Sequence, residues 1–244
     1  MYHPIEWTPE RIERFWNFYG ANAAAHGSYF SGQFGRAIVA LARHHAELSG
    51  TLVDLGCGPG DLVGELLRHG FPCRAMDSSP VAVGRVRERF ARHPDFLGGV
   101  VGSLDRIPLQ DGEAGAVFLI EVLEHLPPEV AAKALAECRR VLQPGGHLIV
   151  TVPNEENLAA NAVACPDCGC VFHRMQHVRR FSQRSLAEEM QRADLDVPFV
   201  AALHLKYFGG NWATRPVGSV RHWARELRRR ANPHLFAIGR RPST

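Results

Sequence analysis

Three side chains with ligand chemistry follow an apolar run near the middle of the chain. Glu121, Glu124 and His125 come directly after the segment AGAVFLI, residues 114–120. On a helix, residues at positions i, i+3 and i+4 lie on one face, so these groups would converge. Carboxylates and imidazoles bind divalent cations, and an imidazole can also serve as a general base. The segment EVLEHL is therefore a candidate for metal binding or proton transfer.

Two alternatives to a metal site stay open for this segment. His125 could act alone as a general base. Glu121 and Glu124 could instead stabilise the positive N-terminal end of the following helix, with His125 as a structural hydrogen-bonding residue.

A second group of potential ligands lies further along, where cysteines and histidines crowd together. In the stretch CPDCGCVFHRMQH, a Cys-x-x-Cys turn lets two thiolates face one zinc ion. We assign Cys165, Cys168 and His173 to a structural zinc site, with Cys170 as a further candidate, and leave His177 for the other site. The spacing is too short for a ββα zinc finger that reads DNA. A loop of reduced thiols is the alternative.

The third candidate site is a glycine-rich loop, DLGCGPG, at residues 54–60. Its glycines allow a sharp turn and the close approach of a ligand. Asp77 ends the next predicted strand, where an acid accepts hydrogen bonds from ribose hydroxyls. A dinucleotide fingerprint would carry its third glycine one residue later, and Asp54 would repel a pyrophosphate but suit an ammonium group. The loop therefore favours an amino-acid nucleoside over a nicotinamide dinucleotide.

The elements around these residues alternate between short apolar segments and amphipathic ones, a pattern typical of a parallel sheet with crossover helices. We predict a doubly wound α/β fold with a mostly parallel, seven-stranded sheet. The predicted strands are 51–56, 72–77, 96–104, 114–120, 145–154, 197–205 and 234–241, and the predicted helices are 61–70, 80–93, 127–142 and 182–195.

The expected domain organisation is a helical cover over residues 1–48, followed by one α/β domain over residues 49–244. Within the cover, Thr8 is a candidate N-cap for a helix that opens with Pro9. The Cys/His-rich part, about residues 160–180, is expected to be an insertion after the fifth strand.

Composition and charge exclude few classes of protein. The chain has 244 residues, 45% of them hydrophobic, and a net charge of +3. It has no apolar signal-peptide core and no run long enough to span a membrane, so a reducing cytoplasm is expected. Arginines cluster between Arg221 and Arg241, where Glu226 is the sole acid. A solvated helix face explains that cluster, with nucleic acid or anionic lipid as alternative partners.

Four segments resemble the class I S-adenosylmethionine-dependent methyltransferases: VDLGCGPGDL, AMDSSP, IEVLEHL and LQPGGHLIVTVPN. The resemblance covers about residues 50–240. Two positions depart from the family pattern, because Ser103-Leu104-Asp105 replaces an acid near the adenine and Gly115-Ala116 replaces an aromatic–Asp pair. The resemblance implies that the cofactor is held by Asp54, Gly56, Cys57, Gly58, Gly60, Asp77, Ser78, Ser103, Leu104 and Glu121.

The pattern Glu-x-x-Glu-His is similar to the metal-binding segment of two subgroups, the small-RNA 3′-terminal 2′-O-methyltransferases and the ubiquinone-pathway O-methyltransferases. That similarity implies a divalent ion, Mg²⁺ or Mn²⁺, at Glu121, Glu124, His125 and His177. Glu121, His125 and His177 are then the expected catalytic residues.

The sequence thus predicts an S-adenosylmethionine-dependent O-methyltransferase that acts on a small-molecule acceptor, with metal assistance and a structural Zn²⁺ as finer expectations. The alternatives are an RNA 3′-terminal 2′-O-methyltransferase, a zinc-knuckle binding protein with a vestigial cofactor pocket and, less favoured, a nicotinamide dehydrogenase. The sequence leaves the acceptor and the oligomeric state open.

Overall fold

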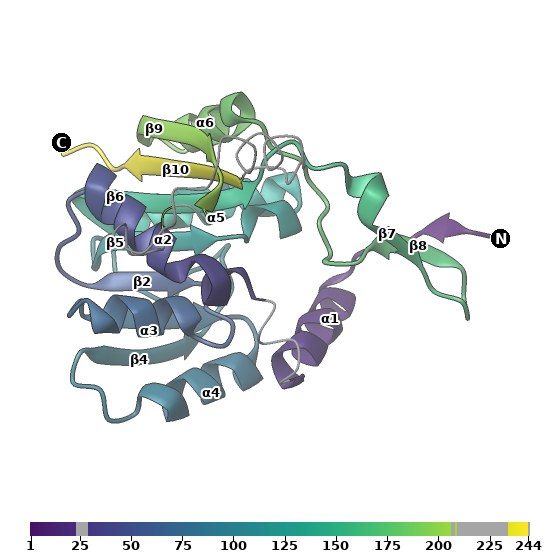
Figure 1. Ribbon diagram of the computed structural model, residues 1–244, viewed down its shortest axis with the longest axis horizontal. Coiled ribbons are helices and arrows are strands. Elements are labelled where there is room, and N and C mark those ends of the chain that lie inside the picture. The colour runs from purple at the N-terminus through teal and green to yellow at the C-terminus, as the bar shows by residue number, and fades with distance from the viewer. Residues whose placement is uncertain (23–28, 206–207, 209–233, 244) are drawn as a thin grey trace, which may run out of the picture.

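The computed structural model describes residues 1–22, 29–205, 208 and 234–243 (Figure 1). Its main sheet has seven strands in the order β4-β3-β2-β5-β6-β10-β9. β10 runs antiparallel to β6 and β9, and the other neighbours are parallel. The strands are β2 (Leu52–Leu55), β3 (Cys73–Asp77), β4 (Phe96–Val101), β5 (Ala114–Ile120), β6 (Leu142–Pro153), β9 (Asp196–Leu203) and β10 (His234–Arg240).

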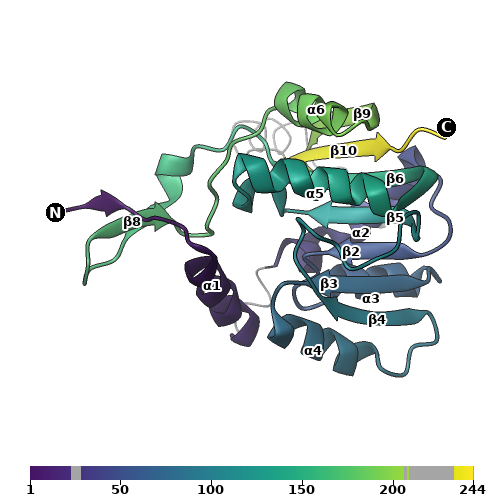
Figure 2. The ribbon, with the colours of Figure 1, turned by 180° about the vertical axis from the view of Figure 1, so that it is seen from behind.

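Helices cover both faces of this sheet, as the predicted doubly wound fold requires. One core forms where α2 (Phe30–His45), α3 (Asp61–Arg68) and Val86 of α4 (Pro80–Phe90) pack on the sheet. The other forms where α5 (Pro128–Val141) and α6 (Gln183–Arg192) pack on the opposite face. Figures 1 and 2 show these two layers from the front and from behind. Because both faces are covered, the central strand β5 is apolar along its whole length, and every one of its residues is buried.

A smaller sheet lies to one side of the main body and was not predicted. It has the order β1-β8-β7, from β1 (His3–Pro4), β7 (Ala162–Ala164) and β8 (Cys170–His173). The expected insertion near residues 160–180 therefore forms a β-hairpin, and the N-terminus adds a parallel strand to it. α1 (Pro9–Ala21) leads from this small sheet to the main one (Figures 1 and 2).

The predicted starts of two helices are confirmed, because a capping residue lies at each of them. The Thr8 hydroxyl accepts a hydrogen bond from the Arg11 N–H, and Pro9 opens α1. Ser182 caps α6 in a reciprocal arrangement with Ser185. Each cap satisfies a backbone N–H that has no partner within the first turn of its helix, so α1 and α6 start where the sequence places them.

Gly115 explains one departure from the family pattern. A Cβ at this position of β5 would lie 1.7 Å from the carbonyl oxygen of Ser49, and the Gly115 N–H donates to the Thr51 oxygen at 2.9 Å. The backbone that enters β2 thus crosses directly over β5. A side chain such as the family's aromatic residue has no room here.

We expect Gly115→Ala to lower the free energy of unfolding by about 1–3 kcal/mol or more, because the added methyl must displace backbone. Gly84→Ala is the matched control. Gly84 lies within α4 with open space around its Cβ position, so alanine should raise stability by about 0.5–1 kcal/mol. Urea denaturation measures both changes, and equal stability of Gly115→Ala and wild type would contradict this packing.

Candidate functional site

The segment EVLEHL leaves the carboxyl end of β5 in a 3₁₀ turn, Leu123–His125. Glu121 has a φ of 53°, and its N–H donates to the Thr151 oxygen of β6 at 2.9 Å. The left-handed residue ends the strand and turns the chain across the sheet edge. The convergence expected from helical spacing is therefore produced by a tight turn.

Glu124 is the most unusual residue of this turn. It is 0% exposed, and neither carboxylate oxygen accepts a hydrogen bond from another described residue. Burial raises the pKa of Glu124 well above its ordinary value, and the nearby Glu121 carboxylate adds to the shift. A buried carboxylate without a partner is costly unless a proton or a cation neutralises it.

Two imidazoles face this carboxylate. The potential ligand atoms of Glu124, His125 and His177 all lie within 4.8 Å of one another. His125 Nδ1 lies 3.4 Å from the Gln176 oxygen, and His177 Nδ1 lies 2.5 Å from Glu156 Oε2. With Nδ1 held in this way, each Nε2 is the nitrogen left for a ligand, the arrangement common in metal sites.

Burial sets the protonation of His125. It lowers the pKa of His125 to about 3, and the charge of His177 acts in the same direction. The ring is therefore neutral at pH 7. A neutral imidazole suits metal coordination, but a group with so low a pKa is a poor general base at neutral pH.

Sequence reasoning missed Glu156, which joins two histidines. Its Oε1 lies 3.2 Å from His173 Nε2, and its other oxygen contacts His177. Burial acts to raise the pKa of Glu156, but the hydrogen bond from His177 and the charges of the two histidines lower it to about 2. The acids of PNEENL follow β6, so their position at a carboxyl end was the available signal.

Glu121 is near Glu124, but it is not part of the set formed by Glu124, His125 and His177, whose ligand atoms lie within 4.8 Å of one another. Its Oε2 lies 3.5 Å from His234 Nε2. Burial raises the pKa of Glu121 to about 8, although the Thr151 hydroxyl opposes the shift. The structure thus brings together Glu124, His125 and His177 from the predicted ion site and keeps Glu121 within electrostatic reach of Glu124.

α1 covers this cluster from outside the sheet. The Trp16 Nε1–H donates to Gln176 Oε1 at 2.9 Å, and the Trp16 ring packs edge-on against His125 with centroids 4.8 Å apart. Gln176 in turn donates to the His125 carbonyl at 3.1 Å. The predicted N-terminal cover therefore contacts the candidate site directly through Trp16.

The glycine loop lies at the same edge, after β2. The Asp77 carboxylate accepts hydrogen bonds from the N–H groups of Gly58 and Ser79, both at 2.9 Å. The Tyr29 ring lies 3.0 Å from where a Cβ of Gly58 would stand. Burial, followed by the charge of Asp77, raises the pKa of Asp54 to about 8. The loop thus lies next to two acids, Asp54 and Asp77. The space at its glycines is too small for side chains.

The remaining predicted cofactor residues differ in exposure. Gly56 approaches the EVLEHL segment, since a Cβ there would lie 2.8 Å from Val122. Gly60 has a φ of 81° and precedes the first residue of α3. Cys57 is buried, Ser78 and Ser103 are exposed, and Leu104 is partly buried against the core. The Ser103 hydroxyl donates to the Asp105 carboxylate, so these two residues already pair.

The cysteine assignment needs one correction. Cys165, Cys168 and Cys170 lie together, with sulfurs within 4.8 Å of one another. His173 stands three residues beyond Cys170 on β8, about 10 Å along an extended strand, and its ring contacts Glu156 and His177 instead. The structure therefore does not bring His173 to the predicted zinc site.

No helix among the described ranges is long and apolar enough to cross a membrane. Of the arginine cluster, Arg240 and Arg241 are described, and the part at residues 221–230 lies outside the described residues.

Replacing Glu124 with glutamine tests the unpaired carboxylate. Above the pKa of an unfolded glutamate, about 4.3, the unfolded chain releases a proton that folded Glu124 retains. Wild-type stability should therefore fall as pH rises towards the raised folded pKa. Glutamine carries no charge, so in chelator at pH 8 Glu124→Gln should be more stable by about 1–3 kcal/mol, with no difference near pH 4.

Glu65→Gln is the matched control, because the buried Glu65 carboxylate is paired with Arg68 and His69. Losing a paired charge should lower stability at pH 8. Urea midpoints at both pH values give the comparison. If Glu124→Gln loses as much stability at pH 8 as Glu65→Gln does, the Glu124 carboxylate is not unpaired.

Comparison with known proteins identifies a methyltransferase domain. Residues 53–150 match a family model described as a methyltransferase domain. The chain is 31% identical over 166 residues to a malonyl-[acyl-carrier protein] O-methyltransferase of Methylococcus capsulatus, covering 66% of this chain and 57% of that protein. It is 32% identical over 152 residues to an uncharacterized transposon protein of Streptomyces fradiae, covering 60% and 42%. The chain thus spans about half the length of these relatives.

Solved structures share the fold at low identity. A Burkholderia thailandensis 1,6-didemethyltoxoflavin-N1-methyltransferase with bound S-adenosylhomocysteine has a TM-score of 0.67 at 14% identity, covering 98% of this chain and 94% of that one. A [4+2]-cyclase, SpnF, has a TM-score of 0.69 at 17% identity, covering 100% and 99%. A Haloferax volcanii chain in complex with the Trm112 methyltransferase activator has a TM-score of 0.68 at 22% identity, covering 93% and 97%. Since one of these is a cyclase, the fold alone does not specify the reaction.

Proposed function

The chain belongs to the class I S-adenosylmethionine-dependent methyltransferase family, and we propose that it methylates an oxygen of a small-molecule acceptor with the help of a divalent ion. The observation that carries the proposal is the buried Glu124 carboxylate, unpaired among the described residues and facing two imidazoles at the sheet edge that also bears the glycine loop. A cofactor at the loop and an ion at Glu124 would lie side by side.

The cofactor-binding part of the proposal rests on the loop and its two acids. Gly56 and Gly58 let the backbone approach the nucleoside closely. Asp77 at the end of β3 is placed to accept ribose hydroxyls in exchange for its present backbone donors. The buried Asp54 lies directly before the loop, where the ammonium group of the bound amino acid would favour its ionised form and pair with it. These features support S-adenosylmethionine.

Methyl transfer from a sulfonium is an in-line displacement. The positive charge on sulfur already activates the methyl donor. The chain must align the acceptor oxygen and help its proton to leave. Glu124, His125 and His177 would hold the ion, with Glu121 beside them. A bound divalent ion lowers the pKa of an oxygen ligand, as zinc lowers that of water from about 15.7 to about 7. Glu156 orients His177 by its hydrogen bond at Nδ1.

The residues fit such an ion by their own chemistry. A cation would neutralise Glu124 and make use of the neutral His125 ring. Mixed carboxylate and imidazole ligands suit Mg²⁺, Mn²⁺ and zinc in different degrees, so the residue set leaves the metal open. Two neighbouring acceptor oxygens, as in a catechol or a diol, would complete the coordination that these side chains begin.

Because α1 covers the cluster of Glu124, His125 and His177, a small acceptor is favoured. Trp16 packs against His125, so an acceptor must enter beside or beneath this helix. Named relatives include the O-methyltransferase above and a C-methyltransferase of ubiquinone/menaquinone biosynthesis from Methylobacterium nodulans, 35% identical over 105 residues and covering 40% of each chain. The preference for oxygen therefore rests on the ion site.

An RNA 3′-terminal acceptor is the second candidate, favoured by the Glu-x-x-Glu-His order and the arginine-rich stretch at residues 221–230. A ribose 2′,3′-diol would offer the ion the same pair of oxygens. Binding of a short RNA that weakens steeply with salt supports this candidate, and absence of binding at low salt removes it.

The cofactor assignment predicts that calorimetry detects S-adenosylmethionine binding to the wild type, and that Asp77→Asn weakens it about tenfold to a hundredfold, because a charge-assisted hydrogen bond contributes about 1.5–3 kcal/mol. Asp111→Asn is the control, since its exposed carboxylate pairs with Arg140 outside the loop. Absence of heat from the wild type would identify a vestigial pocket.

The ion assignment predicts that a chelator abolishes methyl transfer to a panel of catechols and that Mg²⁺ or Mn²⁺ restores it. Glu124→Gln and His177→Gln should lower kcat/KM by about 10-fold to 100-fold or more while the affinity for S-adenosylmethionine stays unchanged. Glu129→Gln, at an exposed acid in the first turn of α5, is the control. Full activity in chelator would contradict the ion.

A further inference from the structure

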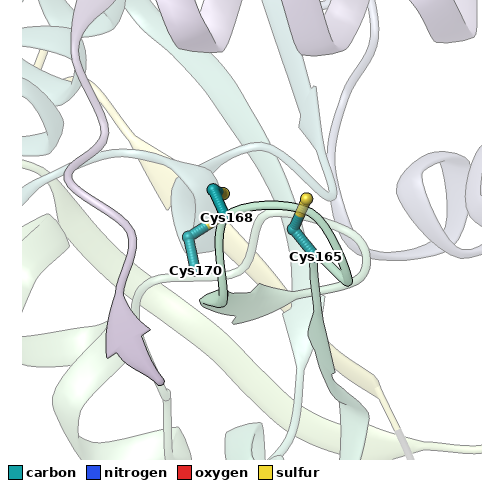
Figure 3. Close-up of side chains that lie close together, drawn as sticks. All are labelled: Cys165, Cys168 and Cys170. Atoms are coloured by element: carbon teal, nitrogen blue, oxygen red, sulfur yellow. The ribbon is translucent and has the colours of Figure 1, made fainter. Parts of the chain in front are cut away.

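The three cysteines of the small sheet form a compact cluster that the proposed reaction does not use. They lie at the turn between β7 and β8, where the Gly169 N–H donates to the Cys165 oxygen at 2.9 Å and the Cys165 N–H to the Cys170 oxygen at 2.8 Å (Figure 3). Zinc–sulfur bonds of about 2.3 Å place tetrahedral sulfurs about 3.8 Å apart. The three sulfurs all lie within 4.8 Å of one another, so their separations are close to those of a zinc ligand set.

The chemical state of the cluster also suits a metal. All three cysteines are free thiols, and Cys168 is exposed. Thiolates are the ligand form of cysteine and select soft or borderline ions such as zinc.

The N-terminal strand places a candidate fourth ligand, His3, beside the cysteine turn, which sequence spacing could not reveal. β1 runs parallel to β8 with His3 opposite Cys170, and residues paired in this way project to the same face. The His3 N–H donates to the Gly169 oxygen at 3.2 Å. A Cβ on Gly169 would lie 2.7 Å from the Met1 oxygen, so the N-terminal backbone passes directly over the cysteine turn.

We propose that the three cysteines and His3 bind one zinc ion, which fastens β1 to the β7–β8 hairpin. β1 is only two residues long and contributes little pairing of its own. The chain then continues through Ile5, whose N–H donates to the Val171 oxygen at 3.0 Å, into α1. A zinc clamp at His3 would therefore hold the start of the cover that places Trp16 on His125.

Cobalt substitution tests the ligand set, because the thiolate-to-cobalt charge-transfer band reports cysteine ligands and ignores an ion at Glu124. With protein made without a histidine tag, the wild type should bind one cobalt with this band. Cys168→Ser should weaken the band, and His3→Ala should lower affinity by about tenfold or more. His173→Ala and the exposed α2 control His44→Ala should bind as the wild type does.

Two outcomes of that titration would overturn the assignment. A wild type without the band has no metal at the cysteines. A His3→Ala variant that binds as tightly as His44→Ala removes His3 from the set, and a loss confined to His173→Ala returns the ligand to His173.

Hydrogen exchange tests the clamp itself. Removing zinc should speed exchange in residues 3–21 and leave β5 unchanged, and His3→Ala should reproduce the effect with metal present. Equal exchange with and without zinc would overturn the clamp. The cobalt titration reports metal binding and hydrogen exchange reports local order. Neither depends on methyl transfer, so the zinc proposal can be tested even if the chain transfers no methyl group.

Discussion

One electrostatic constraint underlies the candidate site: the Glu124 carboxylate is buried, and no other described residue donates a hydrogen bond to it. A paired carboxylate such as Glu65 is stabilised by its neighbours. Glu124 instead faces the rings of His125 and His177 and a second acid, Glu121, so its charge has to be offset by a proton or a cation. These surroundings support the proposed ion site at Glu124.

The rest of the fold places partners around this residue. β5 ends at the turn that carries Glu124, and the backbone N–H groups of Val178 and Arg179 donate to its carbonyl at 2.8 and 3.2 Å. That contact fixes the segment after the hairpin, which bears His177, against the turn. The hairpin also pairs with β1 and so leads into α1. The small sheet, the cover and the candidate site are therefore one connected structure.

Local patterns predicted much of this arrangement. The alternating apolar segments gave the seven strands, Thr8 and Ser182 marked two helix starts, and the glycine loop with Asp77 indicated the cofactor. Three features needed tertiary structure. The pairing of β1 with β8 joins residues over 160 positions apart, Glu156 becomes recognisable only once β6 places it beside the histidines, and the His173 ring lies with Glu156 because an extended strand separates it from Cys170.

A crystal grown with S-adenosylhomocysteine and Mn²⁺, measured at the manganese absorption edge, would show whether Glu124 binds an ion. We expect an anomalous peak between Glu124, His125 and His177, next to a nucleoside whose ribose contacts Asp77. A well-occupied nucleoside with no manganese near Glu124 would contradict it.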